Sequence, residues 1–171
     1  GNFAPWVGAM IVDVAQPILL VCEDGSVEET ITRLSRVGFD QVLGYLEGGM
    51  AAWQAANMEV DQINAISAAE FAQRRNASDI DVIDVRKPGE YLSEHVVAAE
   101  SAPLAALNDH LAEFPKEGPF YIHCLSGYRS LIALSILKAR GYHNGINVEG
   151  GFEAIKQTDA PFSDYVCPTT L

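Results

Sequence analysis

The sequence predicts an α/β protein built on an open parallel sheet with helices on both faces, as one complete and one partial copy. Three observations predict this fold class. Short apolar runs alternate with helical stretches, which is typical of parallel strands joined by crossover helices. A strand–turn–helix unit occurs twice within the 171 residues. Hydrophobic residues make up 49% of the chain, which is enough for a packed core.

The repeated unit spans residues 17–53 and 119–155. Each copy runs from an apolar segment through a cysteine, a glycine-containing turn and a helical stretch to a second apolar segment and a Glu-Gly-Gly triplet. The cysteine, Cys22 or Cys124, stands 26 residues before the first glycine of the triplet in both copies. This equal spacing predicts that the two segments fold alike.

The first copy begins with a strand over residues 17–21. The helix that follows is ended by Gly38, where a left-handed backbone costs little, and a second strand covers residues 42–46. Nothing comparable to the capped helix and strand upstream of the second copy precedes Cys22, so residues 1–58 are predicted to be a partial, inactive module. The apolar face of the helix consists of Val27, Ile31, Leu34 and Val37.

The second copy has additional elements upstream. Ser67 and Glu70 form an S-x-x-E capping box that opens a helix to about Arg75. The apolar run over residues 80–85 predicts a buried strand, and a helix is expected near residues 105–114.

The strand over residues 119–123 leads through the Cys124 turn into a strongly apolar helix that ends at Gly141. A last strand precedes the second Glu-Gly-Gly triplet. Residues 59–171 can therefore form a complete domain.

The balance of 23 acidic against 11 basic residues gives a formal net charge of −12. Binding to nucleic acid is not expected, because phosphate recognition needs concentrated positive charge. No run approaches the roughly 20 apolar residues of a membrane span. The three cysteines have no metal-ligand spacing, so neither a disulfide framework nor a metal site is predicted, and a reducing cytoplasm is expected. The cysteines are Cys22, Cys124 and Cys167.

Cys124 is the candidate nucleophile. A cysteine between an apolar strand and a helix lies near the backbone N–H groups of the helix N-terminus, which stabilise a thiolate or a bound sulfur anion. Gly127 permits the tight turn, and Arg129 adds a fixed positive charge. Ser126 and Ser130 can add hydroxyl donors. In the first copy, carboxylates follow Cys22 and no arginine is present, so Cys22 is expected to be inert.

Four motifs occur in order along the second copy: Asp84-Val-Arg86 with Glu90, His95, the loop Cys124-Leu125-Ser126-Gly127-Tyr128-Arg129-Ser130, and Glu149-Gly-Gly151. With these motifs, residues 64–157 resemble the rhodanese-like superfamily. The resemblance implies that Cys124 accepts sulfur as a persulfide, that the following loop cradles the substrate, and that Arg129 contacts an anionic donor. It also implies no cofactor, and a structural ion-pair group behind the loop formed by Asp84, Arg86 and Glu90.

The repeated unit also resembles paired rhodanese modules that follow a metallo-β-lactamase-fold domain. Such a domain is therefore a possible upstream partner, and the open sheet edges of a half module make a homodimer plausible. One departure from the family concerns Leu125, where thiosulfate-using members often carry a cation. This residue leaves room for a less charged or larger persulfide donor.

The leading hypothesis is transfer of sulfur from thiosulfate or a low-molecular-weight persulfide, through Cys124, to a thiol or cyanide. One alternative is a noncatalytic regulatory or interaction module with the same fold. Another is a related cysteine phosphatase or arsenate reductase, whose loop has one more residue between cysteine and arginine. His95 could reach the site or be structural, and His123 is expected to pack in the core.

Overall fold

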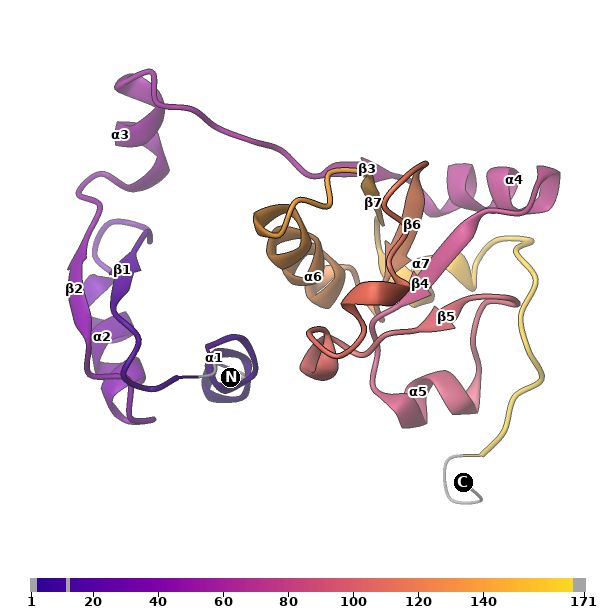
Figure 1. The fold of residues 1–171 in the computed structure, drawn as a ribbon, viewed down its shortest axis with the longest axis horizontal. Coiled ribbons are helices and arrows are strands. Elements are labelled where there is room, and N and C mark those ends of the chain that lie inside the picture. The colour runs from indigo at the N-terminus through magenta and orange to yellow at the C-terminus, as the bar shows by residue number, and fades with distance from the viewer. Residues whose placement is uncertain (1–2, 12, 168–171) are drawn as a thin grey trace. The chain divides into compact units, whose positions relative to one another are not determined.

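The computed structural model describes residues 3–11 and 13–167 (Figure 1). The chain divides into two compact units, residues 1–61 and 62–171. The division falls after Asp61, whereas the sequence analysis placed it after residue 58. No helix in the described part of the chain is long and apolar enough to cross a membrane.

The second unit contains a five-stranded, entirely parallel sheet with the strand order β3-β7-β6-β4-β5. Its strands are β3 (Asn64–Ile66), β4 (Asp81–Asp84), β5 (Glu100–Ser101), β6 (Phe120–His123) and β7 (Gly145–Val148). Its helices are α4 (Ala68–Ala77), α5 (Pro88–Ser93), α6 (Tyr128–Ala139) and α7 (Gly151–Ile155).

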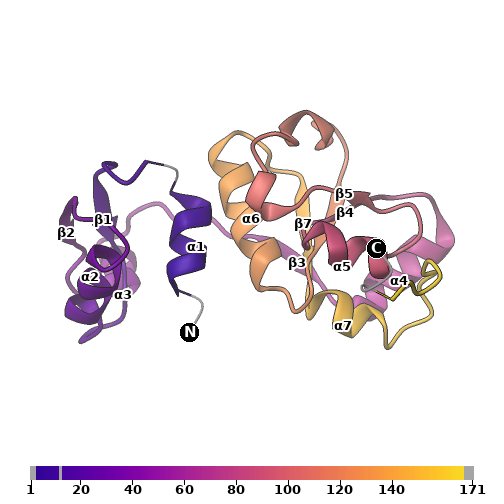
Figure 2. The same ribbon diagram turned by 90° about the horizontal axis from the view of Figure 1, so that it is seen from below.

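Helices cover both faces of this sheet, which confirms the predicted α/β class (Figures 1 and 2). On one face, α4 and α7 contribute Phe71, Phe152 and Ile155 to a core that includes Tyr121 and Val148 of the strands. On the other face α6 packs so closely that a Cβ on Gly145 would lie 2.3 Å from Leu134. Burial of both faces explains why the strands are apolar runs rather than alternating patterns.

Local signals place several elements as expected. Ser67 is the N-cap of α4, and its Oγ accepts a hydrogen bond from the backbone N–H of Glu70 at 3.2 Å. The Glu70 carboxylate binds Arg74, one turn further along. Gly141 adopts φ +90°, and the next residue, Tyr142, donates its N–H to the Leu137 carbonyl, which closes α6 as predicted.

The prediction of a helix near residues 105–114 is wrong. Two single 3₁₀ turns, η1 (Leu104–Ala106) and η2 (Leu111–Glu113), occupy this segment. The Asn108-Asp109 pair between them favours local side-chain bonds over helix, and prolines flank the segment at 103 and 115. The Leu104 N–H also binds the Val85 carbonyl, so η1 is tied to the end of β4.

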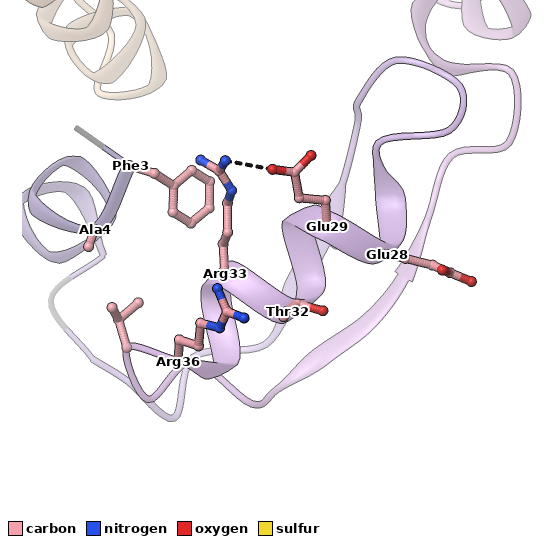
Figure 3. A pocket seen from close by; sticks show the side chains of 8 residues that line it. Phe3, Ala4, Glu28, Glu29, Thr32, Arg33 and Arg36 are labelled. Carbon is pink, nitrogen blue, oxygen red and sulfur yellow. Dashed lines mark ion pairs between the residues drawn. The ribbon is translucent and has the colours of Figure 1, made fainter. Parts of the chain in front are cut away.

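The first unit is smaller. Two parallel strands, β1 (Ile18–Leu20) and β2 (Val42–Tyr45), are joined by α2 (Val27–Ser35), and α3 (Gly49–Ala55) follows. A further helix, α1 (Phe3–Met10), which the sequence analysis did not predict, packs against α2. A hollow of about 600 Å³ between α1 and α2 is lined by Phe3, Ala4, Glu28, Glu29, Thr32, Arg33, Arg36 and Val37 (Figure 3).

Candidate active site

Cys124 follows β6 directly and is 1% exposed. Its Sγ accepts a hydrogen bond from the backbone N–H of Gly127 at 3.2 Å. Gly127 is the N-cap of α6 and has φ +95°, a conformation that favours glycine. The Ser130 hydroxyl lies 3.6 Å from Sγ and also binds the Gly127 carbonyl at 3.0 Å. The sulfur is thus held at the N-terminus of α6, where hydrogen-bond donors favour an anion.

The backbone of the loop is held from behind by α7. The N–H of Phe152 donates to the Cys124 carbonyl at 2.7 Å, and that of Glu153 donates to the Leu125 carbonyl at 3.0 Å. In a trans peptide the following N–H points the opposite way, so the amides of Leu125 and Ser126 face away from α7. Neither amide has a hydrogen-bond partner among the described residues. They remain available to a bound anion.

Gly151 makes this close approach possible. A Cβ at this position would lie 2.5 Å from the Cys124 carbonyl oxygen, and the residue has φ +58°. The Glu-Gly-Gly triplet was recognised in the sequence as a repeat marker. Its role as the backbone contact beneath the cysteine loop emerges only from the structure.

Arg129, in the first turn of α6, forms a bidentate ion pair with Glu90 of α5. The two bonds measure 2.7 Å (Nη1 to Oε2) and 2.8 Å (Nη2 to Oε1). The bond from Arg129 lowers the pKa of the Glu90 carboxyl, and the bond from Glu90 raises the pKa of the guanidinium. Arg129 was expected to meet an anionic donor and Glu90 to join Asp84 and Arg86. The structure pairs Arg129 with Glu90, and the contact of Arg129 with an anionic donor stays a prediction.

Asp84 and Arg86 form a separate ion pair, buried at the end of β4. Arg86 Nη2 lies 2.6 Å from Asp84 Oδ2, and the two side chains are 3% and 0% exposed. The same guanidinium donates to the Glu94 carbonyl and lies 3.8 Å from the centre of the Phe152 ring. Because the Phe152 N–H holds the Cys124 carbonyl, this pair supports the loop through α7. No signal in the sequence showed that Phe152, which follows the Glu-Gly-Gly triplet, has this supporting position.

The loop residues divide into a buried and an exposed set. Cys124, Gly127 and Ser130 are buried. Leu125 and Tyr128 are 36% and 61% exposed, and Ser126 is also exposed. The exposed rim beside the sulfur is therefore mainly apolar and aromatic.

His95 is held by structural contacts. Its Nδ1 lies 2.8 Å from the Tyr91 carbonyl oxygen, its ring stacks on that of Tyr91 at 4.0 Å, and its N–H donates to Ser163 Oγ. These contacts fasten the loop to the segment near the C-terminus. They favour the structural reading of His95 that the sequence left open.

His123 is fully buried and packs against Phe152, as the prediction of a core histidine requires. Its Nδ1 lies 3.3 Å from the Cys124 carbonyl oxygen, and its Nε2 has no hydrogen-bond partner in the described structure. Burial lowers the pKa of the imidazole below its ordinary value of 6.5, opposed in part by the charge of Asp84. The histidine is therefore neutral at pH 7.

Because His123 is buried in its neutral form, we expect the stability of the fold to decrease at acidic pH. The unfolded chain binds a proton below about pH 6.5 that the folded chain refuses until its lower pKa is reached. The free energy of unfolding should fall through that window by up to about 1.4 kcal/mol per pH unit from this group. Denaturant titrations of His123→Gln should lack this contribution, whereas the exposed His143→Gln control should keep it. Equal slopes for all three proteins would contradict the prediction.

The other two cysteines lie elsewhere. Cys22 follows β1 and is half-buried, and Gly49 approaches its carbonyl as Gly151 approaches that of Cys124. Glu23 and Asp24 follow it in the sequence. The expected lack of reactivity of Cys22 stays a prediction. Cys167 is exposed near the C-terminus. Among residues 3–11 and 13–167, no group of three His, Cys, Asp or Glu side chains could hold a metal ion.

Comparison with known proteins agrees with this geometry. The family described as "Rhodanese-like domain" matches residues 67–158. A "Sulfurtransferase" of Allochromatium vinosum is 30% identical over 93 residues, which are 54% of this chain and 87% of the relative. "Thiosulfate sulfurtransferase GlpE" of Coxiella burnetii is 30% identical over 99 residues, 58% of this chain and 90% of the relative. Across the curated relatives, the match spans from 29% to 90% of the relative's length, and it covers 54% of the first of them.

A solved structure shares the same architecture. The rhodanese-like domain protein of Staphylococcus aureus is 30% identical and superposes with a TM-score of 0.52, covering 54% of this chain and 91% of that one. The five-stranded parallel sheet, the Cys124 loop and the family match all fall within the second unit. Through residues 67–158, this chain belongs to the rhodanese-like domain family.

Proposed function

We propose that this protein is a sulfurtransferase that carries sulfur as a persulfide on Cys124. The observation that carries the proposal is the position of Cys124 Sγ, which the Gly127 N–H contacts at 3.2 Å at the start of α6. Unpartnered amides at Leu125 and Ser126 add donors for the extra sulfur atom. Relatives named "Sulfurtransferase" and "Thiosulfate sulfurtransferase GlpE", each 30% identical, support the same reaction class.

The reaction would proceed in two displacements. The Cys124 thiolate attacks the outer sulfur of a donor, the donor's S–S bond breaks, and the leaving group departs with the bonding electron pair. An acceptor thiolate or cyanide then attacks the outer sulfur of the Cys124 persulfide and regenerates the thiolate. No net oxidation occurs and no cofactor is needed, because the sulfane sulfur keeps its oxidation state throughout.

The direct test is intact mass spectrometry of the chain after incubation with thiosulfate or a persulfide. Cys124 should gain the mass of one sulfur atom, and a peptide map should place that atom on Cys124. Addition of cyanide should remove it and release thiocyanate. A protein that gains no sulfur from either kind of donor would refute the proposal.

The length of the loop favours sulfur transfer over phosphate or arsenate chemistry. Arg129 lies five positions after Cys124, one fewer than in the related phosphatases and arsenate reductases. Its guanidinium is also bound to Glu90, not directed at a free anion site. Hydrolysis of a phosphotyrosine mimic would favour the alternative. The noncatalytic alternative predicts a Cys124 that reacts no faster than Cys22.

Several expectations about the whole protein stay predictions. These are a cytoplasmic location, a homodimer, an inactive rhodanese-like module in the first unit, and a metallo-β-lactamase-fold domain upstream.

A further inference from the structure

We propose that Glu90 is a specificity-determining residue that directs the Cys124 site toward persulfide donors with an uncharged body and away from dianions such as thiosulfate. This inference rests on the proposed sulfurtransferase function. It assigns Glu90 a role through Arg129, so Glu90 is a positioning residue that touches no reacting atom.

The positive charge of Arg129 is neutralised by Glu90. Arg129 is the only cationic side chain in the loop from Cys124 to Ser130. Glu90 engages both terminal nitrogens of its guanidinium, at 2.7 and 2.8 Å. The side chains are 17% and 29% exposed, so the pair is partly shielded from water. The carboxylate cancels the positive charge that a dianionic donor would need.

Glu90 is itself held firmly in place. It occupies the third position of α5, where its Oε2 accepts the Lys87 N–H at 3.0 Å. The bond from the Lys87 N–H anchors the Glu90 carboxylate to the N-terminus of α5 while the carboxylate also binds Arg129. Displacement of Glu90 by an incoming dianion would therefore break a capping bond as well as the ion pair.

The rest of the surroundings offers apolar contact rather than positive charge. Leu125 and Tyr128 flank the buried sulfur and are exposed, and Leu131, one turn along α6 from Tyr128, is 40% exposed. The segment that holds the loop from behind carries Glu149 and Glu153. A donor with an apolar body can contact the rim, and its terminal sulfur still reaches the loop amides.

The chemistry balances with a hydropersulfide, R–S–SH. The Cys124 thiolate attacks the terminal sulfur and forms a new S–S bond, while the donor's S–S bond breaks and R–S⁻ leaves with the electron pair. The proton on the transferred sulfur passes to R–S⁻, which leaves R–SH and the Cys124 persulfide anion. That anion carries a single charge, which the amides of Leu125, Ser126 and Gly127 can hold without Arg129.

The test compares two donors, thiosulfate and benzyl hydropersulfide, by the second-order rate constant for loading sulfur onto Cys124. Glu90→Gln keeps the side-chain shape and the helix cap but frees the Arg129 charge. It should raise the thiosulfate rate constant about tenfold, through tighter binding, and change the benzyl hydropersulfide rate constant less than twofold. Arg129→Gln should move the thiosulfate rate constant in the opposite direction.

The matched control is Glu70→Gln, which also removes a carboxylate paired with an arginine near a helix start, on α4. It should leave both rate constants unchanged. If wild-type protein is loaded by the donors but Glu90→Gln leaves their ratio unchanged, or slows both equally, the inference fails and the proposed function stands. If neither donor loads sulfur onto the wild-type protein, both fail.

Discussion

Replacement of Cys124 by serine should abolish sulfur loading and reduce transfer to the uncatalysed background, a loss of about a thousandfold or more. A serine oxygen cannot form a persulfide and is a poor nucleophile at neutral pH. The fold should tolerate the change, because the smaller oxygen can still accept the Gly127 N–H that now binds Sγ. Intact mass after donor treatment, together with thiocyanate release, measures the effect.

Two cysteine variants serve as controls for this experiment. Cys22→Ser removes the corresponding residue of the repeated unit, and Cys167→Ser removes the exposed thiol. Both should retain wild-type transfer rates. If sulfur loading persists in Cys124→Ser, or is lost in Cys22→Ser, a thiol other than Cys124 carries the persulfide.

Alanine in place of Gly151 should have the second largest effect. The new Cβ would lie 2.5 Å from the Cys124 carbonyl oxygen and 2.7 Å from the Leu125 carbonyl carbon, both backbone atoms that cannot rotate away. The left-handed backbone at φ +58° adds strain for any residue with a Cβ. We expect a loss of about 3 kcal/mol in the free energy of unfolding and at least a tenfold loss of activity.

Gly141→Ala separates the two causes. Gly141 also has a positive φ, +90°, but a Cβ there would meet nothing within 4 Å. That variant should lose only about 1 kcal/mol, from backbone strain, and keep its activity. Urea titrations and sulfur-transfer rates of the two variants give the comparison. Equal losses in the two variants would show that the contact of residue 151 with the Cys124 carbonyl oxygen does not contribute to stability.

The positions of α4, β4, β6, α6 and β7 followed from local patterns, whereas β3, α5 and β5 were not predicted. Ser67 caps α4 because a hydroxyl at that position can bond an amide three residues on, and Gly141 ends α6 because it tolerates a left-handed backbone. Local patterns gave a wrong prediction near residues 105–114, where a helix was expected. The turn-forming Asn108-Asp109 pair and the bond from the Leu104 N–H to the Val85 carbonyl favour two separate 3₁₀ turns.

The sequence by itself predicted that the Cys124 thiol lies among backbone amide donors at the start of a helix. An apolar strand, a cysteine, a glycine and a helix start lie within a few residues of one another, so short-range geometry is enough to place the thiol among amide donors. The Gly127 bond to Sγ agrees with this expectation.

Only the tertiary structure decided which partner Arg129 binds and what lies beneath the loop. Glu90 is 39 residues from Arg129 in the chain, and Phe152 is 28 from Cys124. A charged side chain can pair with any of several opposite charges, and only the fold brings the Glu90 carboxylate of α5 within reach of Arg129. In the loop that the sequence predicted as a sulfur site, the one cationic side chain, Arg129, is thus paired with a carboxylate.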